Sequence, residues 1–391
     1  MTALSRLLSQ MHCTDVPQTP PISASAHGPS ATLSQALNSN RILGLDFLRM
    51  AAVLLVLADH SGAVLLGTSI GANGALGVEL FFVISGFLIT WMLMGEHTQS
   101  GRIDFKAFYQ RRVVRLMPVF YAYVAVCIVM LWARGRPVPW DAVVAGMTYV
   151  LNYQQAFNGA PTHFLSHCWS LAVEEQFYFI WPLVLVWLLR RSVQLEHALI
   201  ALILLVWAHR THLHLTGLAS DAYIYRALDT RADHLLIGCL AAVLLRRASI
   251  RDNLSRLDAT CPWLPWLLAC LLIISGQFHG DRDYRYLFAY SIEPLAMALL
   301  IPLVILRAQR PTGWGSRLIN STPVVNMGQA SYGIYLFHPL LLHPVRNLTE
   351  RLTGSFTLAF AVSVGVLSVV AWLSFKHFEN PLRQAWRPKH A

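Results

Sequence analysis

The sequence predicts an all-α fold, a polytopic membrane bundle of about ten spanning helices with both termini in the cytoplasm. Composition is the first indication, because 55% of the 391 residues are hydrophobic and only 13% are charged, whereas soluble domains carry about 25% charged residues. Apolar runs long enough to cross a bilayer also recur along the chain. Basic residues lie scattered beside these runs, so a membrane explains the net charge of +10 better than nucleic acid does.

The ten predicted spans are the long apolar runs, taken in chain order. They cover residues 43–66, 74–95, 113–133, 169–189, 196–214, 231–247, 261–279, 285–306, 323–343 and 355–376. The stretch 142–157 is shorter and more polar, since it carries Asn152, Tyr153, Gln154 and Gln155. It is interpreted as a re-entrant or interfacial helix.

The orientation follows from the basic residues. With a cytoplasmic amino terminus, the inner segments hold more than twice as many Lys and Arg as the outer segments, as the positive-inside rule expects. If 142–157 were a full span, Arg190 and Arg191 would lie outside and the pattern would reverse for every later loop. Ten spans with both termini inside is therefore the consistent topology.

Three segments make up the chain. Residues 1–40 are rich in Ser, Thr, Pro and Ala and contain no sustained apolar run, which predicts a disordered cytoplasmic tail and not a signal peptide. Residues 41–383 form one membrane domain, and 384–391 form a short cytoplasmic tail. The six cysteines show no CxxC spacing, so neither a disulfide framework nor a metal site is expected.

Two ionisable residues share one face of the first span. Arg49 and His60 are eleven residues apart, about three helical turns, so their side chains lie on the same stripe about 16 Å apart along the axis. Ionisable groups inside a membrane are costly and indicate function. The structural alternative is an ion pair between Asp46 and Arg49, with His60 satisfied by its surroundings.

The predicted orientation brings further polar side chains to the outer half of the membrane, where they are expected to converge on one cavity. They are His60, Glu79, Glu174, Asp233 and His338. A histidine oriented by a carboxylate is suited to act as general base on an alcohol. As alternatives, Glu79 and Asp233 pair with Arg231 for structure alone, and His338 reaches toward the interface.

Helical spacing adds several side chains to this set. Ser331, Tyr335 and His338 lie at i, i+4 and i+7 of one face. Tyr178 lies four residues after Glu174, which favours Glu174 over Glu175 as the residue on the polar stripe.

A second group of interest lies on the cytoplasmic side, where the third span begins. Arg112 and Arg115 are three residues apart on one face, an arrangement suited to forked contacts with phosphates. The alternative is a cluster that only sets the topology and contacts lipid headgroups. Spacing alone does not separate the two.

Several stretches together resemble the acyltransferase-3 family of integral membrane proteins. GLDFLRMAAVLLVLADH holds the arginine and histidine of the family's opening motif at Arg49 and His60. GVELFFVISGFLIT has Glu79 where the family often has Asp, and RRVVRLMPVF matches its paired arginines at Arg112 and Arg115. The most recognisable stretch is WSLAVEEQFYFIWPL, which begins at Trp169 and places the family's glutamate at Glu174. RADHLLIG and SYGIYLFHPL resemble later motifs and add Arg231, Asp233, Tyr332 and His338.

The resemblance runs from about residue 42 to 383 and implies an acyltransferase of the bacterial inner membrane. Its donor would be acyl-CoA, with acetyl the commonest acyl group, and its acceptor a hydroxyl of an extracytoplasmic carbohydrate such as an exopolysaccharide, an O-antigen or a lipid-linked glycan. Larger members carry a soluble hydrolase-like domain after the last span. Without that domain, the membrane domain would deliver the acyl group itself or pass it to a glycan-assembly partner.

The expected mechanism joins the two sides of the membrane. Arg112 and Arg115 hold the phosphates of acyl-CoA, and Arg49 positions or polarises the donor. His60, oriented by Glu79 or Glu174, deprotonates the acceptor hydroxyl, by direct transfer or through an acyl-enzyme. The residues expected to contact the acceptor are Trp169, Tyr178, Arg231, Asp233, Ser331, Tyr335 and His338.

Two alternatives remain open from the sequence. Some members of the family acylate small molecules such as macrolides, so the acceptor class is not fixed. A transporter or flippase would also place polar residues inside a helical bundle. The chain shows no interrupted half-helix pair and no two-fold repeat, which makes a transporter less favoured.

Overall fold

The computed structural model describes residues 33–39, 41–62, 64–65, 68–69, 73–159, 164–191 and 193–386. Most of the described residues are helical, and the strands among them are the two of one short antiparallel ribbon, β1 (Val64–Leu65) and β2 (Thr68–Ser69), in which Val64 pairs with Ser69. The all-α class is therefore confirmed. Of the tail predicted over 1–40, residues 1–32 and 40 lie outside the described residues, as do 387–391 of the carboxyl-terminal tail.

One part of the predicted tail is helical. Residues Leu33–Leu37 form α2, and Leu33 and Leu37 are buried against the bundle. The prediction of disorder is wrong for these five residues, because two leucines four positions apart give one apolar face even within a polar segment.

The helices of the first half of the chain are α3 (Leu45–Ser61), α4 (Gly74–Ser100), α5 (Phe105–Ala133), α6 (Trp140–Met147), α7 (Leu151–Asn158), the 3-10 turn η2 (Ser166–Cys168), α8 (Trp169–Arg190) and α9 (Leu195–Thr216). Those of the second half are α10 (Asp221–Arg226), α11 (Leu228–Leu244), α12 (Ala248–Thr260), α13 (Leu264–Gly276), the π-helical η3 (Tyr284–Ala289), α14 (Tyr290–Ala308), α15 (Trp314–Ile319), α16 (Thr322–Gln329), α17 (Ser331–Thr353), α18 (Phe356–Ser374), the π-helical η4 (Phe375–Glu379) and α19 (Asn380–Ala385).

Six helical stretches among the described residues are long and apolar enough to cross a membrane, or up to seven when the bent pair α12 and α13 counts as one. The predicted spans 43–66, 231–247 and 261–279 correspond to shorter helices, α3, α11 and α13. The predicted span 323–343 is interrupted at Ala330, between α16 and α17. A multi-pass membrane bundle is thus supported, and the count of ten spans stays a prediction.

The stretch 142–157 does not form one long helix. It is divided between α6 and α7, with Tyr149 between them at a left-handed φ of 55°. Neither helix is long enough to cross a bilayer, as the sequence indicated.

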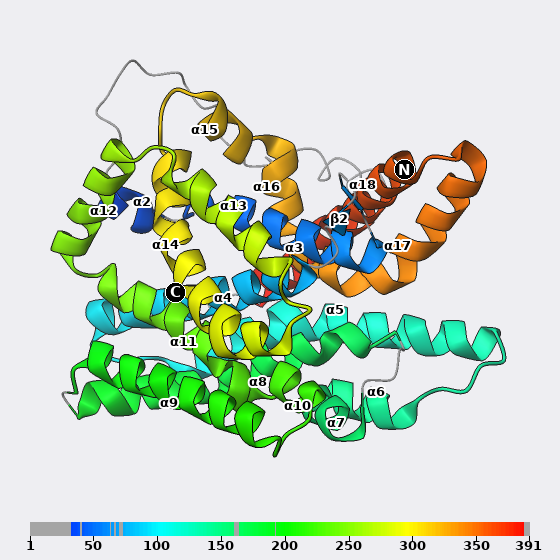
Figure 1. Cartoon of the computed structure of the whole chain (residues 1–391), viewed down its shortest axis with the longest axis horizontal. Coiled ribbons are helices and arrows are strands. Elements are labelled where there is room, and N and C mark those ends of the chain that lie inside the picture. Colours follow the sequence, from blue (N-terminus) through cyan, green and yellow to red (C-terminus); the bar gives the residue numbers. More distant parts are fainter. Residues whose placement is uncertain are drawn as a thin grey trace, which may run out of the picture. The chain divides into compact units, whose positions relative to one another are not determined.

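Helix α4 lies between α3 and α11 at the centre of the bundle (Figure 1). Two glycines let α4 and α11 approach closely. A Cβ atom on Gly86 would lie 1.9 Å from the carbonyl oxygen of Leu235, and one on Gly238 would lie 2.1 Å from that of Val83. Small residues that bring two backbones together are characteristic of helix packing in membranes.

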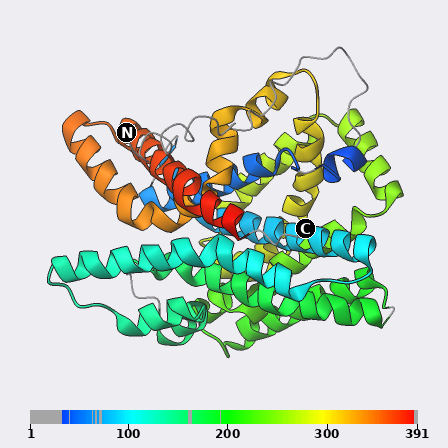
Figure 2. The ribbon, with the colours of Figure 1, turned by 180° about the vertical axis from the view of Figure 1, so that it is seen from behind.

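The outer helices present apolar side chains outward. Val129 on α5, Leu205 on α9 and Val369 on α18 are all exposed. These three helices are also long and apolar enough to cross a membrane. Such surfaces suit contact with lipid tails. Figure 2 shows α18 running alongside α17.

Helix α3 carries both residues of the predicted Arg49 and His60 stripe. It ends at Gly62, whose left-handed conformation (φ 67°) lets its N–H donate to the carbonyls of Ala58 and Asp59. The helix packs against α4, α16 and α17, and this contact brings its polar stripe toward the other candidate residues.

Candidate active site

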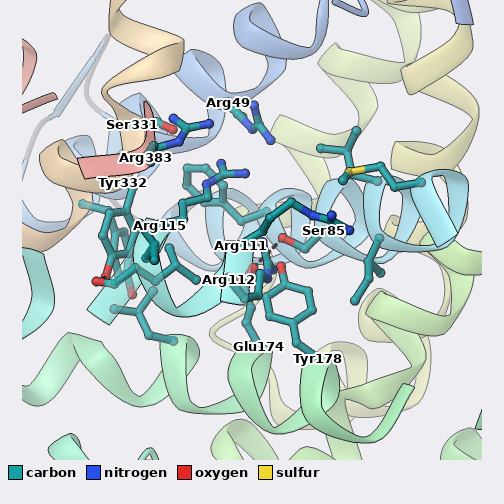
Figure 3. A pocket seen from close by; sticks show the side chains of 18 of the residues that line it. Arg49, Ser85, Arg111, Arg112, Arg115, Glu174, Tyr178, Ser331, Tyr332 and Arg383 are labelled. Carbon is teal, nitrogen blue, oxygen red and sulfur yellow. Dashed lines mark hydrogen bonds between the residues drawn. The ribbon is translucent and has the colours of Figure 1, made fainter. Parts of the chain in front are cut away.

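A cavity of about 340 Å³ lies among α3, α4, α5, α8, α17 and α19. Five arginines line it: Arg49 from α3, Arg111, Arg112 and Arg115 from α5, and Arg383 from α19. Figure 3 shows their guanidinium groups gathered around the cavity, with Glu174 and Tyr178 reaching it from α8. The structure therefore brings Arg49, Arg112 and Arg115 together, and it adds Arg111 and Arg383, which were not among the predicted site residues.

We call the five arginines that line the cavity the arginine cluster, and one of them, Arg112, keeps a free donor. Arg112 stacks over the Tyr178 ring, with its guanidinium carbon 3.3 Å from the ring centroid. Its Nε is buried and has no hydrogen-bond partner among the described residues. Ionised guanidinium donors in a small cavity are suited to phosphate or carboxylate oxygens.

Arg49 is both paired and part of the cavity wall. Its Nη1 lies 3.7 Å from a carboxylate oxygen of Asp46, and Asp46 also accepts hydrogen bonds from Arg41. The ion pair raised as a structural alternative thus exists, and it orients Arg49 along the face that lines the cavity.

Glu174 lies in this cavity, where Ser85 donates a hydrogen bond of 2.8 Å to its carboxylate. Glu174 and Tyr178 both line the wall, and Glu175 does not. Of the two glutamates, Glu174 is thus the one that faces the cavity, on the side that helical phase favoured, and its part in the reaction stays a prediction. Its expected convergence with His60 is wrong, because Glu174 lies beside Arg112 at the arginine cluster.

The far wall of the cavity is polar and buried. Tyr335 donates a 2.7 Å hydrogen bond to the carbonyl oxygen of His167, and Ser170 Oγ lies 2.6 Å from the Tyr335 hydroxyl. Both side chains line the cavity, and so does Ser331. Ser331, Tyr335 and His338 follow one face of α17, as their spacing predicted.

Behind this wall three histidine rings meet, and we call His60, His167 and His338 the histidine cluster. The ring centroids are 4.7 Å apart between His60 and His338 and 4.8 Å apart between His167 and His338. The His167 ring also lies against the Tyr335 ring, at 5.4 Å. Tyr335 therefore contacts both the cavity and the histidine cluster.

Backbone carbonyls set the orientation of two of these rings. His60 Nδ1 lies 3.0 Å from the carbonyl oxygen of Val56, and His338 Nδ1 lies 2.5 Å from that of Tyr335. Because a carbonyl oxygen only accepts, Nδ1 is the donor in each contact, and in the neutral form of each ring the lone pair lies on Nε2. The His338 Nε2 is buried without a hydrogen-bond partner among the described residues.

The carboxylate expected to orient His60 is not in place. The nearest carboxylate that pairs with His60 is its neighbour Asp59, whose oxygen is 3.9 Å from Nδ1. Glu79 is fully buried elsewhere and pairs with Arg231 at 3.3 Å. On α4 the cavity is lined by Val78, Phe82 and Ser85, and Glu79 points about 100° away from Val78.

Asp233 and Arg231 belong to a separate buried network between α4, α9, α11 and α14. Asp233 pairs with Arg210 at 2.7 Å and with His234 at 2.8 Å, and Arg231 stacks over the Tyr290 ring at 3.8 Å. The structural alternative thus holds for Glu79, which pairs with Arg231, but not for Asp233, whose ion-pair partners are Arg210 and His234 in place of Arg231. Trp169, expected at the site, is buried between Phe82 and Tyr225 and does not line the cavity.

Several residues at these sites were not predicted from the sequence, among them His167, Arg210, His234 and Arg383. His167 lies in the 3-10 turn η2 before α8, so the helical phase of α8 does not locate it. Arg383 lies on α19 beyond the last predicted span. Arg210 meets the predicted residue Asp233 only in three dimensions. His234 follows Asp233 directly in the sequence, and adjacent residues point in different directions on a helix, so helical spacing does not single it out.

A metal ion has no ready site in the part of the chain that the structure describes, since no group of three or more His, Cys, Asp or Glu side chains is placed to hold one. The side chains that line the cavity offer guanidinium groups, one carboxyl group and hydroxyls, and the histidine cluster offers imidazoles.

A family model described as an acyltransferase domain matches residues 42–375. The chain is 31% identical to YrhL of Bacillus subtilis over 362 residues. This aligned region covers 88% of the chain and 55% of YrhL. It is 27% identical over 361 residues to OatA of Staphylococcus aureus strain NCTC 8325, covering 87% of the chain and 57% of that protein. YrhL is named as a peptidoglycan O-acetyltransferase and OatA as an O-acetyltransferase.

OatA of Listeria monocytogenes is named as a peptidoglycan O-acetyltransferase, and it is 28% identical over 359 residues, with 87% of the chain and 55% of that protein covered. The chain thus spans little more than half the length of these relatives. No solved structure matches it.

Proposed function

Because the chain belongs to the family of membrane acyltransferase domains whose model covers residues 42–375, we propose that it is an O-acetyltransferase that moves an acetyl group from cytoplasmic acetyl-CoA to a hydroxyl of an extracytoplasmic glycan. The reaction breaks the C–S bond of the thioester and forms a C–O ester bond. The acceptor hydroxyl loses its proton, and the thiolate of CoA gains one.

The observation that carries this proposal is that the arginine-lined cavity adjoins the histidine cluster. Ser170 and Tyr335 line the same cavity as the arginines, and Tyr335 contacts His167 and His338. A phosphorylated donor and a basic imidazole thus have adjoining sites. Between Arg49 and His60 the helix rises about 16 Å, a distance suited to the long, flexible pantetheine arm between the phosphates and the thioester.

The arginines are proposed to bind the donor. Arg111, Arg112, Arg115 and Arg383 supply cationic donors for the phosphates of acyl-CoA, and Arg49 lies next along α3 toward the thioester. The positive-inside distribution puts this end on the cytoplasmic side, where acyl-CoA is made.

His60 is proposed as the general base. Its Nδ1 donates to the Val56 carbonyl, which leaves Nε2 free to take the proton of an acceptor hydroxyl. The His60 side chain is 43% exposed, so an acceptor can reach it from the outer side. His338 contacts the His60 ring, and Tyr335 and Ser331 lead from there into the cavity.

The surroundings of the enzyme are proposed from the same family. It would lie in the cytoplasmic membrane of a bacterium with ten spans and both termini inside, act without a metal, and have glycan-assembly proteins as partners. The relatives named for peptidoglycan make that polymer the first acceptor to examine.

A vesicle experiment tests the proposal. Inverted membrane vesicles holding the full chain are loaded with soluble muropeptides and given acetyl-labelled acetyl-CoA from outside. We expect label in the enclosed muropeptides, with mass spectrometry showing an added acetyl group. Movement of muropeptides across the membrane without acetylation would replace the enzyme by a transporter.

A further inference from the structure

A second cavity of about 620 Å³ lies among α3, α4, α13, α14 and α15, on the side of α3 that faces away from Arg49. Its wall on α3 is formed by Phe47, Ala51, Leu55 and Ala58 among others. The proposed donor site and this cavity therefore share α3 as a common wall. The volume lies within the range of about 300–1,000 Å³ that small-molecule sites occupy.

One end of this cavity is cationic. Along one face of α14 the lining residues are Met297, Leu300, Val304 and then Arg307, so the wall changes from apolar to charged at one end. Arg310 lines the same end. Asp258 accepts from Arg307 at 2.7 Å and from Arg310 at 2.6 Å, so two guanidinium groups share one carboxylate and a net positive charge remains.

Two stacked tryptophans lie at the same end. The rings of Trp266 and Trp314 are 5.4 Å apart and nearly parallel. Both line the cavity and both are exposed, at 45% and 69%. Tryptophan is enriched where the hydrocarbon of a membrane meets the headgroups.

The bend between α12 and α13 gives a second indication of the membrane boundary. The polar α12 meets the apolar α13 at 88°. If α13 enters the hydrocarbon, α12 lies along the surface, as interfacial helices do. Asp258 is in the last turn of α12, so Arg307 and Arg310 lie at the level of lipid headgroups.

The depth of the cavity matches one leaflet. From Phe47 to Ala58 the wall on α3 rises about 16 Å, and the hydrocarbon core of a bilayer is about 30 Å thick. The cavity therefore suits a single acyl chain that enters from one surface and ends near the midplane.

We propose that this cavity binds one acyl chain of an anionic phospholipid, with the lipid phosphate at Arg307 and Arg310 and the headgroup beside Trp266 and Trp314. The predicted orientation makes it a lipid of the cytoplasmic leaflet. The site is separate from the proposed donor cavity and does not depend on the proposed function.

Binding of the lipid's acyl chain is tested by filling the cavity. The full chain is purified, stripped of lipid and titrated with phosphatidylglycerol under native mass spectrometry. Ala269→Phe places a ring in the cavity, since Ala269 lines it, and we expect at least a tenfold loss of binding. Cys270→Phe is the matched control, because Cys270 is exposed and does not line the cavity; it should bind as the wild type does.

The thermal midpoint of each variant shows whether it folds, and Ala51→Leu replaces Ala269→Phe if the latter does not. Glycerol 3-phosphate, which has the phosphate without a chain, should not compete. Wild-type binding by a folded cavity-filling variant, or full competition by glycerol 3-phosphate, would overturn the acyl-chain site.

The headgroup is tested by charge. We expect the wild type to prefer phosphatidylglycerol over phosphatidylcholine of the same chains. Arg310→Gln should reduce this preference about fivefold, the effect of one basic residue near an anionic lipid, while Arg307 keeps its contact with Asp258. Arg317→Gln removes an exposed arginine that does not line the cavity and should change little. An equal loss in both variants, or no preference in the wild type, would show surface attraction in place of a site.

Discussion

His60 and His338 meet edge to face, with ring centroids 4.7 Å apart, although they come from opposite ends of the chain. Each ring donates its Nδ1 proton to a backbone carbonyl, so the Nε2 atom of each is the one left to accept a proton. Of the two, only His60 is substantially exposed. Because of this difference in exposure, we assign the proposed proton transfer to His60, and His338 only contacts the His60 ring.

Replacement of the proposed base should stop the reaction. His60→Ala is expected to lower acetyl transfer by about 10²–10⁴-fold, the usual contribution of a general base, with little change in the KM for acetyl-CoA. Labelled transfer in vesicles measures it. His343→Ala is the matched control, because His343 is exposed on the same helix as His338; wild-type turnover by His60→Ala would remove His60 from the reaction.

The arginine cluster should govern donor affinity. The double variant Arg112→Ala with Arg115→Ala is expected to raise the KM for acetyl-CoA about tenfold or more, since hydrogen bonds to charged groups contribute about 1.5–3 kcal/mol each. Steady-state kinetics with acetyl-CoA measures it. Acetyl-dephospho-CoA, which lacks one phosphate, should show a smaller difference between variant and wild type. Arg256→Ala removes an exposed arginine outside the cavity, and an effect as large there would point to general charge.

The Glu79 and Arg231 pair should matter first for stability. Arg231→Met leaves the Glu79 carboxylate buried without its ion-pair partner, which is expected to lower the free energy of unfolding by about 3–5 kcal/mol. Adding Glu79→Gln should recover part of this loss. Thermal unfolding in detergent measures both, with Arg282→Met as the exposed-pair control. A stable Arg231→Met protein without activity would instead give the pair a role in the reaction.

The close approach of α4 and α11 predicts a sharp difference between two glycines. Gly86→Ala puts a methyl group 1.9 Å from the Leu235 carbonyl oxygen and should destabilise the protein by about 1–3 kcal/mol. Gly365→Ala meets nothing within 4 Å and should change stability by less than about 1 kcal/mol. Thermal midpoints of the two purified variants compare them, and equal midpoints would contradict the packing described.

The proposed topology is open to a labelling test. In a variant without the native cysteines, Asp281→Cys should react with an impermeant maleimide added to intact cells, because the residue is exposed in a segment predicted to lie outside. Asp252→Cys, exposed on α12, should react only after the cells are permeabilised. The opposite pattern would invert the proposed orientation.

Local spacing predicted the parts of the site that lie on one helix. Arg49 reaches the cavity and His60 reaches the histidine cluster along one stripe of α3. Glu174 faces the cavity and Glu175 does not, because 3.6-residue periodicity fixes relative direction within a helix. The all-α class followed just as directly from composition.

Contacts between helices were not predictable in the same way. The sequence does not determine how far α4 is rotated about its axis relative to α3. The outer carboxylates were therefore expected beside His60, but Glu79 pairs with Arg231 on α11. His167 lies in a 3-10 turn before α8, so the helical periodicity of α8 does not predict the direction of its side chain. The boundaries of α3, α11 and α13 depend on packing that hydropathy does not report.

The length of α3 has a consequence for the membrane itself. With 17 residues the helix is about 25 Å long, shorter than a hydrocarbon core of about 30 Å. In the proposed topology the bilayer must thin around α3, or water must reach its ends. Either adjustment brings His60, in the last turn, closer to the aqueous phase. Turnover of the enzyme should therefore depend on the chain length of the lipids in which it is reconstituted, and thicker bilayers should slow it.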